Sequence, residues 1–127
     1  MRYDVPVMSK QAQILIVDDD EEIRSFLGML LQEEGYAIES AEDGLAALEK
    51  LEATKPDLIL LDIMMPRMDG YRFAEALRQR DLQPPIPFIV LSANLREQQA
   101  IAMGACSYIA KPFDLPDLLE KVEQYTG

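Results

Sequence analysis

The sequence predicts a single open, doubly wound α/β domain, in which helices cover both faces of a parallel five-stranded sheet. Two observations lead to this prediction. Short, β-rich apolar runs alternate five times with amphipathic segments, a pattern typical of parallel strands joined by helical crossovers. A chain of 127 residues is also long enough to bury one core without disulfides or a structural metal.

The first strand is expected at residues 13–17 and the first helix at 21–34. Apolar residues recur in this helix at a spacing that places them on one face. The residues expected to face the sheet are Ile23, Phe26, Leu27, Leu30 and Leu31. Gly35 is expected to end the helix.

The second strand is expected at 36–40 and is followed by a helix at 43–53 that ends before Pro56. This helix is expected to direct Leu45, Leu48 and Leu51 inward. The third strand, at 57–61, is almost wholly apolar, which is typical of a central strand covered on both faces.

Turn-forming residues Pro66 and Gly70 separate the third strand from a helix expected at 71–80. The stiff segment around Pro84 leads into the fourth strand. The remaining elements are strands at 88–91 and 107–110 and helices at 95–103 and 115–125.

Composition excludes several classes of function. A formal net charge of −11 would repel a phosphate backbone, so we expect no direct binding to nucleic acid. Histidine is absent, which removes every mechanism that uses histidine of this chain as nucleophile, base or metal ligand. No apolar run approaches the length of a membrane span, and Cys106 is expected to be a small buried hydrophobe. We expect a cytoplasmic protein.

Four strands end at residue types that phosphoryl transfer requires. These residues are Asp18, Asp19 and Asp20 after the first strand, Asp62 after the third, Ser92 after the fourth and Lys111 after the fifth. Because the carboxyl ends of parallel strands meet at one edge of an open sheet, these side chains are expected to form one pocket.

The acidic run has two interpretations. Asp18, Asp19 and Asp20 can cap the following helix and complement its dipole. Three adjacent carboxylates also repel one another, and Mg²⁺ would neutralise some of that charge. Asp62 favours the second interpretation, because a carboxylate that closes an apolar central strand must face the open edge and can act there as a nucleophile on phosphorus.

Ser92 and Lys111 complete the set of groups, as a hydroxyl donor and a cation for the phosphoryl oxygens. The segments IVDDD, LDIMMPRMDG, LSA and YIAKPF resemble, in order, the signature segments of the receiver domain of two-component response regulators. The likeness is strongest to stand-alone, chemotaxis-type receivers. It implies a flavodoxin-like fold with strand order 2-1-3-4-5 and five helices, formed by residues 13–127, with 1–12 as an N-terminal extension.

The resemblance implies a role for each matching residue. Asp62 would be the phosphoacceptor, and Asp19 and Asp62 would ligate Mg²⁺ together with the backbone carbonyl of Met64. Asp18 would act through a metal-bound water, while Ser92 and Lys111 would bind phosphoryl oxygens.

Two further features follow from the same resemblance. Tyr108 would be an aromatic switch that turns inward when Ser92 is drawn to the phosphoryl group, and the peptide bond between Lys111 and Pro112 would be cis.

The implied function is a phosphorylation switch. The donor would be a sensor histidine kinase or a phosphotransfer protein, docking on the first helix through Ser25, Gly28, Met29 and Gln32. The chain would not be an enzyme beyond catalysing its own phosphorylation and dephosphorylation. Its signal would pass to a downstream protein target through the fourth helix, fifth strand and fifth helix, in a monomer or a weak, phosphorylation-dependent dimer.

The sequence departs from the receiver pattern at two places. The spacing from Ser92 to Lys111 is about three residues shorter than usual, close to one helical turn, so the fourth helix or its flanks must be shortened. Arg67 stands where receivers often have glycine.

Two alternatives use a related fold. A haloacid-dehalogenase-like phosphatase would need a second aspartate two positions after the nucleophile, where this chain has Met64. An unphosphorylated, flavodoxin-like cofactor module would need a hydroxyl-rich loop after the first strand, where this chain has three acids. Neither pattern is met.

Overall fold

The computed structural model describes residues 11–127, which fold as alternating strands and helices. The strands are β1 (Gln13–Val17), β2 (Ala37–Ala41), β3 (Leu58–Asp62), β4 (Phe88–Ser92) and β5 (Ser107–Ala110). The helices are α1 (Glu21–Glu33), α2 (Gly44–Ala53), α3 (Gly70–Gln79), α4 (Glu97–Ala102) and α5 (Leu115–Thr126). All strand pairs are parallel and the order is β2-β1-β3-β4-β5, which confirms the predicted fold class.

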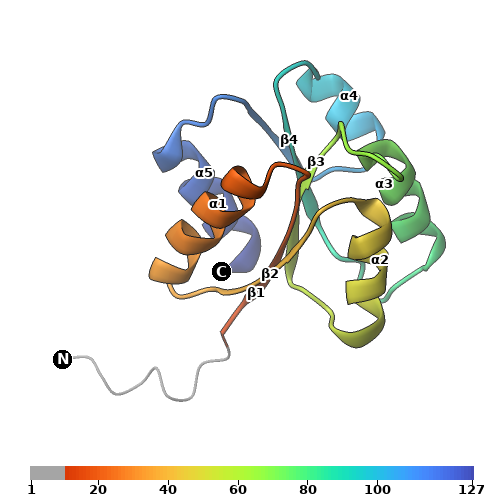
Figure 1. Ribbon diagram of the computed structural model, residues 1–127, viewed down its shortest axis with the longest axis horizontal. Coiled ribbons are helices and arrows are strands. Elements are labelled where there is room, and N and C mark those ends of the chain that lie inside the picture. Colours follow the sequence, from red (N-terminus) through yellow and green to blue (C-terminus); the bar gives the residue numbers. More distant parts are fainter. Residues whose placement is uncertain (1–10) are drawn as a thin grey trace.

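The sheet separates two layers of helices, with α1 and α5 on one face and α2, α3 and α4 on the other (Figure 1). Successive side chains of β1 point to opposite faces of the sheet. Ile14 and Ile16 pack with α1 and α5, whereas Leu15 and Val17 pack with α2 and α3. Every residue of β3 and β4 is buried. The sheet is therefore a rigid platform whose central strands end inside the protein.

Aspartates precede four of the helices in the described part of the chain, and the side chains of three of them cap the first turn. Asp20, Asp43 and Asp69 each accept a hydrogen bond from a backbone N–H in the first turn of the helix that follows. Gly35 and Gly104 follow the ends of α1 and α4 with φ of 101° and 102°, a left-handed conformation that glycine adopts without strain. Local capping thus accounts for part of the acidic composition.

Several expected boundaries differ from those observed. β3 and β4 each extend one residue further, because Asp62 pairs with Leu91 and Ser92 pairs with Ala110 in the parallel ladder. α4 contains only 6 residues, fewer than expected, because Gly104 stops it at one end and Arg96 is still extended at the other. A short α4 is consistent with the shortening expected in the fourth helix or its flanks.

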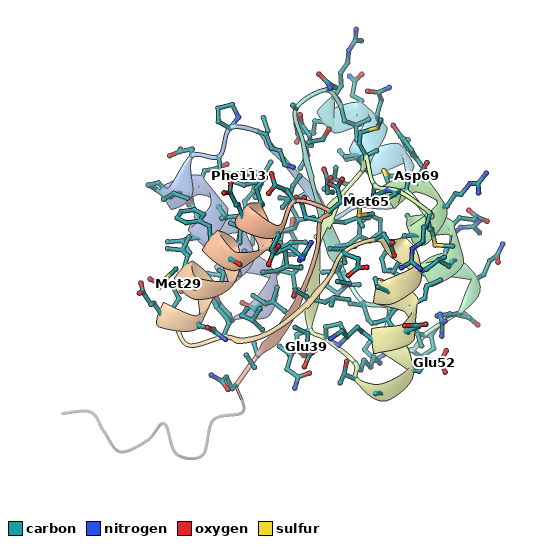
Figure 2. The ribbon with its side chains drawn as sticks, in the orientation of Figure 1. Met29, Glu39, Glu52, Met65, Asp69 and Phe113 are labelled. Atoms are coloured by element: carbon teal, nitrogen blue, oxygen red, sulfur yellow. The ribbon has the colours of Figure 1, made fainter. Side chains whose placement is uncertain are left out.

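The expected orientation of α1 was wrong at two residues. Leu27, Gly28 and Leu31 are buried against the sheet, whereas Phe26 is 46% exposed. Phe26 lies about 100° around the helix from Leu27, so both cannot point at the same strands. Met29, on the outer side of α1, is also exposed (Figure 2).

Leu45, expected to face inward from α2, is exposed because the buried side of that helix is formed by Gly44 and Ala47, and Leu45 lies about 100° around the helix from Gly44. Cys106 is only half-buried, yet burial raises the pKa of its thiol to about 11, so it stays protonated at neutral pH. None of the helices within residues 11–127 is long and apolar enough to cross a membrane.

Candidate functional site

The carboxyl ends of β1, β3, β4 and β5 surround an open pocket of about 270 Å³. Its walls are formed by Asp18, Asp19, Asp20, Ile23, Asp62, Met64, Ser92, Ala93, Asn94 and Lys111. All the residues expected to bind metal or phosphoryl groups are in this set, although they come from four strands. Parallel pairing brings them together, as the sequence analysis predicted.

Three carboxylates form the floor of the pocket. One carboxylate oxygen each from Asp18, Asp19 and Asp62 lies within 4.8 Å of the others. Asp18 and Asp62 are buried, while Asp19 is exposed. Asp20 does not join this cluster, because its carboxylate caps α1 and accepts hydrogen bonds from Glu22 N and Ile23 N at 2.9 and 3.3 Å.

Lys111 bridges the two buried acids. Its Nζ lies 3.2 Å from Asp18 Oδ2 and 3.3 Å from Asp62 Oδ1. Burial disfavours the lysine charge, but the two carboxylates outweigh this effect and raise the pKa of Lys111. One cation thus faces two buried anions.

The charge on Asp62 is only partly compensated. Burial, and then the negative charge of Asp18, raises the pKa of Asp62 above its usual value, while Lys111 acts in the opposite direction. A perturbed carboxyl in a pocket with a specific charge partner is typical of functional sites. The site therefore favours the arrival of additional positive charge.

The loop that carries Asp18 is held from several sides. The backbone N–H of Asp18 donates to Ala41 O at 3.1 Å, and Asp18 Oδ1 accepts from Asp20 N at 2.9 Å. Arg24 Nη1 donates to the Asp18 carbonyl at 2.7 Å. Sequence analysis did not identify Arg24. The available signal was a single arginine on an otherwise acidic first helix, about one turn beyond the acidic run.

Ser92 and Tyr108 are linked through the end of β4. The Ser92 hydroxyl oxygen accepts a hydrogen bond from Asn94 N at 3.2 Å, so its own proton remains available for another acceptor. The half-buried Tyr108 does not line the pocket, but its hydroxyl donates to the Ser92 carbonyl at 3.1 Å. The peptide bond between Lys111 and Pro112 is cis, as expected.

The donor set fits Mg²⁺. Three carboxylates offer hard oxygen ligands within reach of one ion, Met64 is among the residues that line the pocket, and the open side leaves room for water and a phosphate. The raised pKa of Asp62 indicates that its negative charge lacks full compensation from protein groups alone.

Comparison with known proteins agrees with this geometry. The family described as response regulator receiver domain matches residues 14–123. The chain belongs to this family. As a receiver domain it is 39% identical over 113 residues to Response regulator MprA of Mycobacterium ulcerans (strain Agy99), a match that covers 87% of this chain and 48% of that protein. The receiver domain thus spans about half the length of such relatives.

Solved receiver structures have the same fold. Chemotaxis protein CheY4 of Vibrio cholerae superposes with a TM-score of 0.84 at 33% identity, covering 91% of this chain and 99% of the other. The receiver domain of a signal transduction histidine kinase from Syntrophus aciditrophicus gives 0.81 at 34% identity, covering 91% and 89%. These matches support neither the phosphatase nor the cofactor-module alternative for this receiver.

Proposed function

We propose that this receiver accepts a phosphoryl group on Asp62 from the phosphohistidine of a sensor histidine kinase or phosphotransfer protein, in a Mg²⁺-dependent reaction. The observation that carries the proposal is the placement of Asp62, buried at the end of β3, beside two further carboxylates and the Lys111 ammonium. Residues 13–127 form the proposed functional unit, and most of the expected extension over 1–12 lies outside the described residues.

Each pocket residue has a proposed task. A carboxylate oxygen of Asp62 attacks phosphorus, a bond between oxygen and phosphorus forms, and the imidazole nitrogen of the donor leaves with the electron pair of the broken bond. Lys111 pairs with the phosphoryl oxygens, and the Ser92 hydroxyl donates to one of them.

The proposed Mg²⁺ ligands are Asp19, Asp62 and the Met64 carbonyl, with Asp18 acting through water. Bound there, Mg²⁺ would offset the negative charge of the transferring phosphoryl group. The receiver would thus promote only its own phosphorylation and dephosphorylation, rather than act as an enzyme on other substrates.

Tyr108 is the proposed link to the output surface. Its hydroxyl bond to the Ser92 carbonyl makes its position sensitive to movement of β4 when Ser92 engages the phosphoryl group. The signal would reach a downstream protein through α4, β5 and α5. We propose action in the cytoplasm without direct contact to nucleic acid or membrane, as a monomer or weak, phosphorylation-dependent dimer.

The test is phosphorylation by acetyl phosphate with Mg²⁺, followed by intact-mass measurement. Wild type should gain one phosphoryl mass, and Asp62→Asn should gain none. Asp57→Asn is the matched control, because Asp57 precedes the same strand and its carboxylate accepts a hydrogen bond from Gln13 N at the opposite edge of the sheet. A full phosphoryl yield in Asp62→Asn would refute the assignment.

A further inference from the structure

An ion pair outside the acidic pocket fastens the β3–α3 loop to α2. Arg67 Nε donates to Asp43 Oδ2 at 2.6 Å, and Arg67 Nη2 donates to Asp43 Oδ1 at 3.0 Å. This forked contact is geometrically specific, because two N–H groups of the guanidinium donate to the two oxygens of one carboxylate. A second contact, from Gly44 N to Met68 O at 3.0 Å, reinforces the attachment.

The partner of Arg67 is itself fixed. Asp43 is 1% exposed, and its Oδ1 also accepts from Ala46 N at 2.9 Å as the N-cap of α2. Burial acts to raise the pKa of Asp43, but the bonds from Arg67 and Ala46 outweigh it and lower the pKa, so the carboxylate is charged at neutral pH. The ion pair thus fastens the β3–α3 loop to the N-cap of α2, and loops are usually more mobile than the helices they adjoin.

Arg67 holds an unusual backbone conformation at this position. Its φ is 63°, in the left-handed region that residues other than glycine seldom adopt. The residue therefore makes a sharp bend in the loop while its side chain anchors that bend to Asp43.

The bend lies close to a proposed metal ligand. Met64 lines the acidic pocket and is 73% exposed. The hydrogen bonds that shape this loop involve residues on either side of Met64. Gly70 N donates to Ile63 O at 2.8 Å, and Met68 N donates to Pro66 O at 2.6 Å. The position of the Met64 carbonyl consequently depends on how the two flanks are held.

We propose that Arg67 is a positioning residue for phosphoryl transfer, whose ion pair with Asp43 holds the β3–α3 loop so that the Met64 carbonyl stays at the metal pocket. The inference rests on the proposed function, because it assumes that Mg²⁺ binds among Asp18, Asp19 and Asp62. It adds a residue that lies outside the pocket and touches neither metal nor phosphate.

The test is calorimetric titration of the unphosphorylated protein with Mg²⁺ alone, alongside thermal melts in EDTA. Arg67→Gly removes the ion pair and keeps a residue that tolerates positive φ, and Arg67→Gln removes the charge and fork while keeping a polar, unbranched side chain. Both variants should bind Mg²⁺ about fivefold more weakly, a coupling at the low end of the usual range because the guanidinium is half exposed. Phosphorylation by acetyl phosphate should slow at limiting Mg²⁺ and recover at saturating Mg²⁺.

Arg78→Ala is the matched control, since Arg78 also forms an exposed ion pair, with Glu75, but at the far end of α3. It should bind Mg²⁺ as wild type does. Wild-type Mg²⁺ affinity in a folded Arg67→Gly or Arg67→Gln variant would overturn the inference, even if that variant melts at a lower temperature in EDTA. A wild type that binds no Mg²⁺ would instead overturn the proposed function, and this inference with it.

Discussion

Single residues in this receiver were predicted best where residue type and strand position both carried information. Asp62, Ser92 and Lys111 line the expected pocket because each lies at or directly after the end of a parallel strand, and strand ends can be recognised in the sequence. Contacts between loops were missed. The pairing of Arg67 with Asp43 joins residues far apart in the chain, and no local pattern indicates that the two loops meet.

The Asp43 carboxylate should give the folded state a pH dependence. Its pKa is lowered in the folded protein, so its stabilising contribution is present above its unfolded pKa of about 3.9 and is lost as the pH falls through the folded value. Asp43→Asn retains a capping side chain and removes this contribution. The difference in unfolding free energy between wild type and Asp43→Asn, measured by urea unfolding, should be constant from about pH 5 to 7 and shrink at lower pH. A difference that grows on acidification would contradict this.

At the scale of elements, helical spacing identified α1 correctly but not which residues face the sheet. Five apolar positions were assigned inward, yet the helix contacts the sheet along a narrower stripe centred on Leu27, Gly28 and Leu31. A glycine was interpreted as an exposed position because it carries no hydrophobic signal. The orientation of the helix depends on the neighbouring strands, and helical periodicity alone does not describe them.

Gly28 is predicted to tolerate alanine. A Cβ there would meet Ile38 Cγ2 at 3.6 Å, an ordinary packing distance, and alanine favours a helix over glycine by about 0.5–1 kcal/mol. Gly28→Ala should therefore raise the unfolding free energy by that amount in urea titrations. Gly70→Ala is the contrasting variant, because its Cβ would lie 2.6 Å from the Asp62 carbonyl oxygen and should destabilise the protein. Destabilisation by Gly28→Ala would show that α1 packs more tightly than described.

The corrected orientation of α1 revises the surface proposed for the phosphoryl donor. Exposed Phe26 and Met29 are three residues apart, so they lie on adjacent turns of one face. Met29→Glu and Phe26→Glu should each slow phosphotransfer from the cognate donor roughly tenfold, as expected for an apolar contact worth 1–2 kcal/mol, and leave phosphorylation by acetyl phosphate unchanged. Ile101→Glu, at an exposed apolar residue of α4, is the control for transfer. If Met29→Glu and Phe26→Glu accepted the phosphoryl group from the donor as fast as Ile101→Glu does, α1 would not be part of the docking surface.

At the scale of the whole molecule, the fold was predictable because every level of the sequence agrees with it. Apolar runs, helix caps and turn residues all indicate alternating strands and helices, and parallel strands then require that functional groups meet at one edge. The length of α4 and the exact strand ends were less predictable, since ladder pairing across the sheet extends β3 and β4 into Asp62 and Ser92.

The same convergence that creates the pocket also concentrates charge. Asp18 and Asp62 are buried together and share one lysine, so the fold contains an uncompensated negative charge at its functional edge. A protein that keeps such a cluster gives up stability for function. Any cation that binds only the folded state should restore part of that stability.

Mg²⁺ should therefore raise the melting temperature. At ten times its dissociation constant, a ligand specific to the folded state adds about 1.4 kcal/mol, or roughly 4–7 °C for a domain of this size. Melts in EDTA, in Mg²⁺ and in NaCl of equal ionic strength separate binding from general screening. Asp18→Asn should melt a few degrees above wild type in EDTA, because it removes one of two facing negative charges while its amide oxygen can still accept from Asp20 N, and it should respond less to Mg²⁺. If NaCl raised the wild-type melting temperature as much as Mg²⁺, and Asp18→Asn melted below wild type in EDTA, the three acids would not form a metal pocket.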